Sequence, residues 1–181
     1  MSAEKKSSIV NIRVLCAVAL LTACATVIAY ICKSFTLTPY IRITFENLPL
    51  ILTGYLFGPW AGLAAGLASD FLNTAVTYGL GQLNPLLTLG AGIVGFAAGA
   101  VSRWILPKRG TVQLAVSVAA AHIIGNMIVK SAGMMIYFST PLPLLLPRIP
   151  LYLCIGIIEF FFLFVLSHNK GINKVVGAIH S

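Results

Sequence analysis

Residues 14–32 form an apolar run of nineteen positions without a single charged side chain. A helix needs about 20 mainly apolar residues to cross a bilayer, so this run is long enough to span one. The rest of the chain has the same character: 59% of its 181 residues are hydrophobic and only 9% are charged. Soluble domains carry about 25% charged residues. The composition therefore excludes a soluble globular domain, a disordered chain and a coiled coil, and it predicts a membrane protein.

The apolar runs are continuous, whereas the strands of a membrane β-barrel alternate in polarity over segments of about ten residues. The sequence therefore predicts an all-α membrane protein with six transmembrane helices and a single integral-membrane domain over residues 1–181. The first run is long for a cleaved signal peptide, whose apolar core has about 7 to 15 residues, although Ala23-Cys24-Ala25 imitates a cleavage site. The expected helices cover about 14–32, 45–57, 60–77, 85–104, 111–138 and 150–167, and Gly58-Pro59 separates the second from the third.

The distribution of positive charge predicts the orientation. With six spans both termini share one side, and that side holds eight of the twelve lysines and arginines: Lys5, Lys6, Arg13, Arg103, Lys108, Arg109, Lys170 and Lys174. The opposite loops hold Lys33, Arg42 and Arg148, while Lys130 lies within the fifth helix. The positive-inside rule then places both termini in the cytoplasm. The net charge of +8 is thus a topology signal and not a sign of nucleic-acid binding.

Four charged residues fall inside or at the edge of the expected spans: Glu46, Asp70, Lys130 and Glu159. An ionised side chain at mid-bilayer costs about 2.5 to 3.5 kcal/mol on insertion scales, so each is a candidate functional group. Two structural alternatives remain open. Asp70 and Lys130 could form an internal ion pair that holds helices together, and Glu159 could be a hydrogen-bonded structural group.

Polar residues also follow helical spacing. His122, Asn126 and Lys130 recur at every fourth position of the fifth helix, and Gly133 and Tyr137 roughly continue this stripe. On the sixth helix Tyr152, Gly156 and Glu159 share a face in the same way. A polar stripe in a spanning helix must face protein or water. Together with the outward loops these stripes predict an outward-facing ligand pocket, in which His122 by itself is interpreted as a packing or hydrogen-bonding residue.

Small residues recur at four-residue intervals, which allows close approach of helix backbones. Most of these pairs are expected to pack inside the protein, and some could dock another membrane protein. The pairs are Ala19 and Ala23, Ala25 and Ala29, Gly62 and Gly66, and Gly95 and Gly99.

The sequence has no motif for ATP hydrolysis or for known hydrolytic chemistry: G-x-x-x-x-G-K-[ST], H-E-x-x-H and G-x-S-x-G are all absent. We therefore expect no enzyme, no cofactor and no metal site, and a partner must supply energy for any uphill transport. An intramembrane enzyme that uses His122 and Asp70, and a passive facilitator, are the weaker alternatives. The cysteines stand in no metal-type spacing and are interpreted as packing residues: Cys16, Cys24, Cys32 and Cys154.

One set of residues resembles the substrate-binding S components of energy-coupling factor (ECF) vitamin transporters, and most closely their folate-type group. The resemblance extends over nearly the whole chain. Its residues are the run from Arg42 to Pro49 (RITFENLP), Gly54, the run from Leu56 to Pro59, Gly62, Gly66, Asp70, Pro85, Thr88-Leu89, and Leu-Pro-Arg-Ile at 146–149.

This resemblance implies a multi-pass subunit of the bacterial cell membrane that captures a vitamin from outside. It also implies association with a transmembrane coupling protein and two ABC-type ATPases. The family's docking motif on the first helix would fall on Ala19 and Ala23 or on Ala25 and Ala29, and the sequence does not decide between them. The loops 33–44, 78–85 and 139–149 correspond to the family's gates.

The chemistry of the candidate pocket favours folate or a reduced folate. A carboxylate can accept paired hydrogen bonds from the amino-pyrimidinone edge of a pterin, and cations suit the carboxylates of the glutamate tail. Another vitamin, such as pantothenate or a pterin-like precursor, remains the alternative. The candidate ligand-binding residues are Tyr40, Arg42, Glu46, Asn47, Asp70, Asn73, Asn84, Asn126, Lys130, Tyr137, Arg148, Tyr152 and Glu159.

Overall fold

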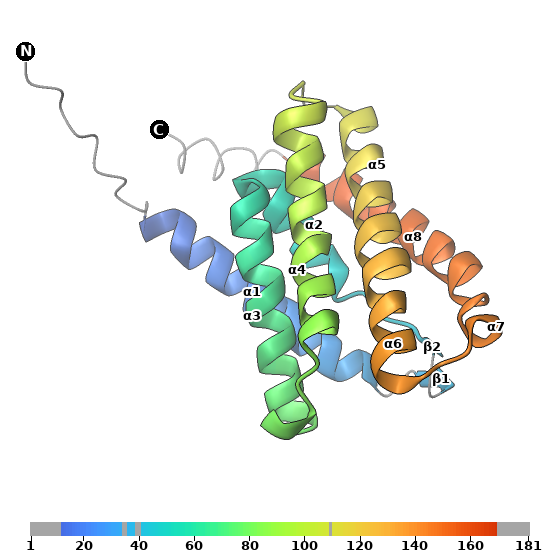
Figure 1. Cartoon of the computed structure of the whole chain (residues 1–181). Coiled ribbons are helices and arrows are strands. Elements are labelled where there is room, and N and C mark those ends of the chain that lie inside the picture. Colours follow the sequence, from blue (N-terminus) through green and yellow to red (C-terminus); the bar gives the residue numbers. More distant parts are fainter. Residues whose placement is uncertain (1–11, 34–35, 39–40, 109, 170–181) are drawn as a thin grey trace, which may run out of the picture.

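The computed structural model describes residues 12–33, 36–38, 41–108 and 110–169, and this part of the chain is helical apart from one short hairpin (Figure 1). Strands β1 (Thr36–Thr38) and β2 (Ile41–Arg42) form that hairpin, and short helical turns occur at η2 (Leu80–Gln82) and α7 (Leu142–Leu145). The helices are α1 (Ile12–Cys32), α2 (Asn47–Phe57), α3 (Pro59–Thr77), α4 (Pro85–Ala100) with its extension η3 (Val101–Ile105), α5 (Thr111–Ala120), η4 (Ala121–Lys130), α6 (Ser131–Phe138) and α8 (Arg148–His168).

The helical elements agree with the expected spans to within two residues at each end, counting α4 with η3, and α5, η4 and α6 as one continuous helix. Among the described residues, four helices are long and apolar enough to cross a bilayer: 12–32, 85–105, 111–138 and 142–168. Helix α2 is apolar but has only 11 residues. The all-helical membrane class is therefore confirmed, while six spans and the orientation of the termini remain predictions.

The loops expected from the sequence contain more structure than predicted. Residues 33–44 were expected to be a plain loop, but the Thr-Leu-Thr segment of β1 pairs with β2 because β-branched residues favour extended backbone. Residues 139–149 were also expected to be a loop, and they contain α7, which begins just after Pro141. The hairpin, α7 and the turn between α3 and α4 all lie at one end of the molecule, the lower end in Figure 1.

Helices α2 and α4 form the centre of the bundle. Nearly all of α2 is buried, including Leu50 and Ile51, and these pack in the same core as Val94 and Ala98 of α4. Helix α8 by contrast leaves a row of large apolar side chains exposed, such as Phe161. This distribution suits a bilayer, because a central helix surrounded by protein need not match the bilayer thickness, whereas outer helices present apolar side chains to lipid.

Glycines bring α3 and α4 into backbone contact. A Cβ atom on Gly62 would collide with the carbonyl oxygen of Gly95, and one on Gly66 would collide with that of Ala91. A Cβ atom on Gly54 of α2 would meet the same Gly95 oxygen. The close approach predicted from the four-residue glycine spacing is therefore confirmed, and it joins α2, α3 and α4 at one point.

Gly95→Ala tests this contact. The added methyl group must displace backbone, and overpacking of this kind costs about 1 to 3 kcal/mol. We expect a clear fall in the melting temperature of the detergent-solubilised protein, measured by scanning fluorimetry. Gly81→Ala is the matched control, because nothing lies within 4 Å of its added Cβ. An equal effect of both substitutions would contradict the packing role of Gly95.

Candidate functional site

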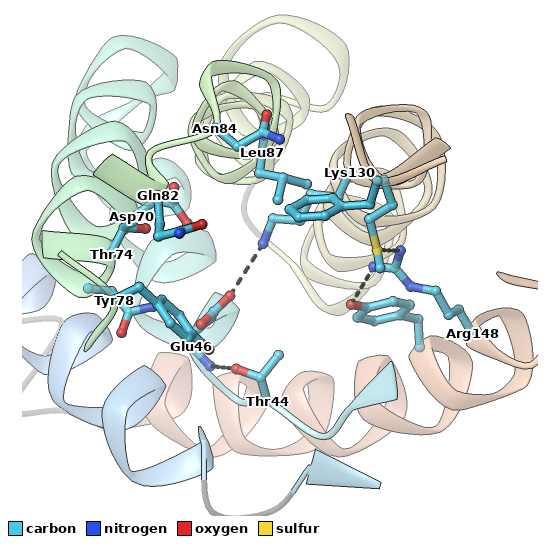
Figure 2. A pocket seen from close by; sticks show the side chains of 14 residues that line it. Thr44, Glu46, Asp70, Thr74, Tyr78, Gln82, Asn84, Leu87, Lys130 and Arg148 are labelled. Carbon is cyan, nitrogen blue, oxygen red and sulfur yellow. Dashed lines mark hydrogen bonds and ion pairs between the residues drawn. The ribbon is translucent and has the colours of Figure 1, made fainter. Parts of the chain in front are cut away.

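A cavity of about 530 Å³ opens among the helix ends that carry the hairpin and α7 (Figure 2). Ligand pockets commonly measure about 300 to 1,000 Å³, so the space suits a small organic molecule. Its wall combines acidic, amide, basic and aromatic side chains from five of the helices, from the turn between α3 and α4, and from the segment before α2. The lining residues are Thr44, Glu46, Asp70, Asn73, Thr74, Tyr78, Gln82, Asn84, Leu87, Lys130, Met134, Phe138, Arg148 and Tyr152.

An ion pair between Lys130 and Glu46 crosses the middle of the cavity. The Lys130 Nζ atom lies 3.3 Å from Glu46 Oε1, and the side chains are only 11% and 9% exposed. The backbone N–H of Glu46 donates to the Thr44 hydroxyl, and the lysine stem runs beside Gly90, where a Cβ would lie 2.6 Å from Lys130 Cγ. The alternative that Lys130 pairs with Asp70 is therefore wrong: the bend before α2 brings Glu46 to the lysine instead.

The α3 and α4 wall carries hydrogen-bonded polar groups. Asp70 Oδ2 accepts from the Thr88 hydroxyl at 2.7 Å, and Asn73 Oδ1 accepts from Thr77 at 3.2 Å. Asn84 is the N-cap of α4, and its side-chain oxygen accepts from the Leu86 and Leu87 N–H groups. Within the described residues no cation pairs with Asp70, so this wall has a net negative charge.

The α8 wall carries Arg148, which is 6% exposed. Its guanidinium donates to the Tyr152 hydroxyl at 3.0 Å and to the Met134 sulfur at 2.8 Å, with a longer contact of 3.4 Å to Ser131. All three are neutral acceptors. Over the part of the chain that the structure describes, Arg148 has no carboxylate partner, and this wall has a net positive charge.

The cavity is therefore electrically polar. Figure 2 shows Asp70 and Thr74 on one side, Arg148 on the opposite side, and the Glu46–Lys130 pair between them. Because the central pair is neutral as a whole, the uncompensated charges are one carboxylate and one guanidinium at opposite walls. Such a cavity suits a ligand that has hydrogen-bond donors at one end and an anionic group at the other.

Seven of the thirteen predicted ligand-binding residues line the cavity: Glu46, Asp70, Asn73, Asn84, Lys130, Arg148 and Tyr152. Asn47, Asn126 and Glu159 are completely buried outside its lining. Ligand contact at these three would require the protein to move. Tyr40 lies outside the described residues, and for Arg42 the structure describes only the backbone, in β2.

Tyr137 is 55% exposed and does not line the cavity, so it does not share the buried face of the polar stripe, and its contact with a ligand stays a prediction. His122, Asn126, Lys130 and Gly133 are buried as the stripe predicts. The stripe assumes α-helical spacing throughout, but Ala121–Lys130 is π-helical, with hydrogen bonds between residues five apart, so the residues that follow are rotated relative to that spacing.

Several lining residues were absent from the predicted set: Thr44, Thr74, Tyr78, Gln82, Leu87, Met134 and Phe138. Helical spacing could have found four of them. Thr74 and Tyr78 follow Asp70 at successive four-residue steps, and Met134 and Phe138 follow Lys130 in the same way. No comparable signal marks Leu87, which becomes a wall residue only through the packing of α4.

His122 and Glu159 form a second buried polar contact, behind the cavity. His122 Nε2 lies 2.9 Å from Glu159 Oε2, and His122 Nδ1 lies 3.2 Å from the Asn126 side-chain nitrogen. The imidazole is 4% exposed and Glu159 is fully buried. The interpretation of His122 as a hydrogen-bonding residue agrees with this geometry, as does the structural alternative for Glu159.

The two alanine pairs of α1 differ in burial. Ala25 and Ala29 are 0% and 1% exposed and pack against the bundle, whereas Ala19 and Ala23 are exposed. Of these two pairs, Ala19 and Ala23 therefore lie on the surface, where they are available for contact with another protein.

Comparison with known protein families matches residues 13–167 to the family described as "ECF transporter, substrate-specific component". The chain belongs to this family. Its members are substrate-binding components of transporters, so the chain is a membrane transport protein and not an enzyme. Membership implies a vitamin-type substrate and association with an ECF module.

Solved structures share the fold. One is the crystal structure of FolT bound with folic acid, with a TM-score of 0.68 and 17% sequence identity over 84% of this chain and 90% of that chain. Another is the S component of a bacterial ECF transporter, with a TM-score of 0.65 and 20% identity over 85% of this chain and 92% of that chain. No curated protein matches the chain.

Lys130→Met tests the central ion pair. Removal of the lysine takes away the cation that lies 3.3 Å from the buried Glu46 carboxylate, and broken buried pairs cost roughly 3 to 5 kcal/mol. We expect a large fall in the melting temperature of the purified S component in detergent. The double variant Glu46→Gln/Lys130→Met should recover part of this loss, because it removes both charges. Additive losses in the double variant would contradict the pairing.

Proposed function

We propose that this S component captures folate or a reduced folate from outside the cell. The observation that carries the proposal is the charge separation in the cavity, with Asp70 on one wall and Arg148 on the other. The fold supports it, because a similar fold was solved with folic acid bound.

In this proposal the pterin lies toward α3. Its amino-pyrimidinone edge presents neighbouring N–H groups, which a carboxylate accepts as a pair of charge-assisted hydrogen bonds. Asp70 already accepts from Thr88 through Oδ2, so Thr88 holds the carboxylate in place while its remaining acceptor capacity serves a ligand. Tyr78 and Phe138 also line the cavity and supply aromatic rings on which a flat heterocycle can pack.

The glutamate tail lies toward α8 in the same proposal. Arg148 donates only to neutral acceptors, and a ligand carboxylate is a stronger acceptor for a guanidinium than a tyrosine hydroxyl or a thioether. Lys130 is already paired with Glu46 and contributes less net charge. Arg148 is therefore the main candidate for the tail among the described residues, and Arg42 is a second candidate from the sequence.

Other vitamins match the two walls less well. Thiamine is cationic and would leave Arg148 without a partner, while riboflavin needs neither charge. Pantothenate would satisfy Arg148 but offers no heteroaromatic donor edge to Asp70. Folates have both the donor edge for Asp70 and the carboxylates for Arg148. A pterin-like precursor has only the donor edge.

For transport we propose the arrangement that the family implies. The chain is a single domain over residues 1–181 with six spans, cytoplasmic termini and an outward-facing cavity. A coupling protein and two ABC-type ATPases supply the energy. Since Ala25 and Ala29 are buried, docking uses Ala19 and Ala23 on the exposed face of α1.

Isothermal titration calorimetry on the purified protein in detergent tests the substrate. We expect one folate to bind per chain without ATP. Arg148→Ala should weaken folate by about tenfold or more, because a hydrogen bond to a charged group contributes about 1.5 to 3 kcal/mol. The same variant should affect pteroate less, because pteroate lacks both carboxylates of the glutamate tail and retains one carboxylate, on its benzoate ring.

Asp70→Asn is the matched variant for the other wall, and it should weaken folate and pteroate alike because both contain the pterin. Binding of pantothenate or another vitamin with no heat from folates would refute the substrate assignment. Equal losses of folate and pteroate in Arg148→Ala would refute the placement of the tail.

Ala23→Leu tests the docking face. The larger side chain lies on the exposed surface of α1, so folate binding by the isolated protein should be unchanged while folate uptake by cells that express the whole transporter falls. Ala25→Leu is the control for the buried side and should reduce the amount of folded protein. Loss of binding in Ala23→Leu would show that this face packs internally.

A further inference from the structure

Polar side chains line the seam between α8 and the helix formed by η4 and α6. On α8 these are Arg148, Tyr152 and Glu159, which share one face with Gly156. Arg148 contacts Met134 and Ser131 of α6 at the cavity end of the seam, and Glu159 contacts His122 of η4 deeper in the bundle. Two polar contacts, about three helical turns apart, therefore join α8 to the neighbouring helix.

The hydrogen bonds of the His122 imidazole indicate which of its ring nitrogens carries the proton. The Asn126 side-chain nitrogen can only donate, so His122 Nδ1 accepts and the ring proton lies on Nε2. His122 Nε2–H then donates to Glu159 Oε2 at 2.9 Å. Burial of either group without its partner would be costly, because the site is closed to water. The contact therefore favours one relative position of α8 and η4.

Packing around the ring supports the same conclusion. A Cβ atom on Gly156 would lie 3.2 Å from His122 Cδ2, so α8 approaches the imidazole closely at this glycine. The His122 and Tyr152 rings lie 6.0 Å apart between centroids. Tyr152 in turn accepts from Arg148, so the imidazole lies one side chain away from the cavity wall.

A groove interrupts the apolar packing along this seam. This groove of about 320 Å³ runs between α5, η4 and α8, with Ala115, Ala119 and Gly156 among its lining residues. His122 and Tyr152 also line this groove, so the polar contact lies where the apolar packing beside α8 is interrupted. The polar contact between His122 and Glu159 therefore contributes more to the position of α8 here than it would in a fully packed seam.

We propose that His122 and Glu159 are a positioning pair that sets the place of Arg148 and Tyr152 in the cavity, and thereby the affinity for the glutamate tail of the ligand. The inference rests on the proposed folate function. Arg148 and Tyr152 are the α8 residues that line the cavity, and a helix transmits a displacement at Glu159 over the roughly 16 Å to Arg148. The pair itself does not touch the ligand.

The test compares two substitutions of Glu159 by their effects on folate and on pteroate. Glu159→Gln keeps an acceptor for His122 Nε2–H, and we expect nearly normal affinity for both ligands. Glu159→Leu removes the acceptor, and we expect folate to weaken by about tenfold with a much smaller change for pteroate. Phe161→Leu, on the exposed face of α8, is the control and should change neither affinity.

Gly156→Ala is a milder second variant if Glu159→Leu fails to fold. It keeps every polar group and shifts the imidazole by a few tenths of an ångström, so folate should weaken a few-fold while pteroate is unchanged. If the variants weaken both ligands equally, or neither, the positioning role is refuted while the folate function stands. If the unmodified protein binds neither ligand, the proposed function is refuted together with this inference.

Discussion

The absence of water in the hydrocarbon interior governs this structure. A polar side chain there must find a partner within the protein, and the two buried contacts Lys130–Glu46 and His122–Glu159 meet this requirement. Each joins residues far apart in the sequence: the first ties the start of α2 to η4, and the second ties α8 to η4. The charged residues that are costly in a bilayer thus hold together the helices around the cavity.

The same requirement gives the cavity its chemical character. Pairing of Glu46 with Lys130 neutralises the middle of the cavity and leaves Asp70 and Arg148 as the uncompensated charges on opposite walls. In a low-dielectric surrounding such charges interact strongly with a complementary ligand. The proposal of a ligand with donors at one end and carboxylates at the other therefore rests on which charges are already paired.

Much of the fold could be predicted because it depends on local pattern. Apolar runs located the helices, Gly58-Pro59 separated α2 from α3, and the spacing of Gly62 and Gly66 indicated their close contact with α4. Which charged side chains pair with one another was harder to predict from the sequence. The sequence left a pair between Asp70 and Lys130 as an open alternative, because both lie in the same half of the bundle, but the position of Glu46 depends on the bend before α2, which has no local sequence signal.

The sequence by itself determined the membrane class, the helix positions and the family, because hydrophobic length, glycine spacing and motif residues are properties of consecutive positions. Only the tertiary structure decided that Ala25 and Ala29 are buried while Ala19 and Ala23 are exposed, and that Glu159 lies behind the cavity instead of in it. The physical reason is that burial and charge pairing depend on how helices rotate against one another. A rotation of one residue, about 100°, moves a side chain from lipid to core, and packing between distant segments fixes that rotation.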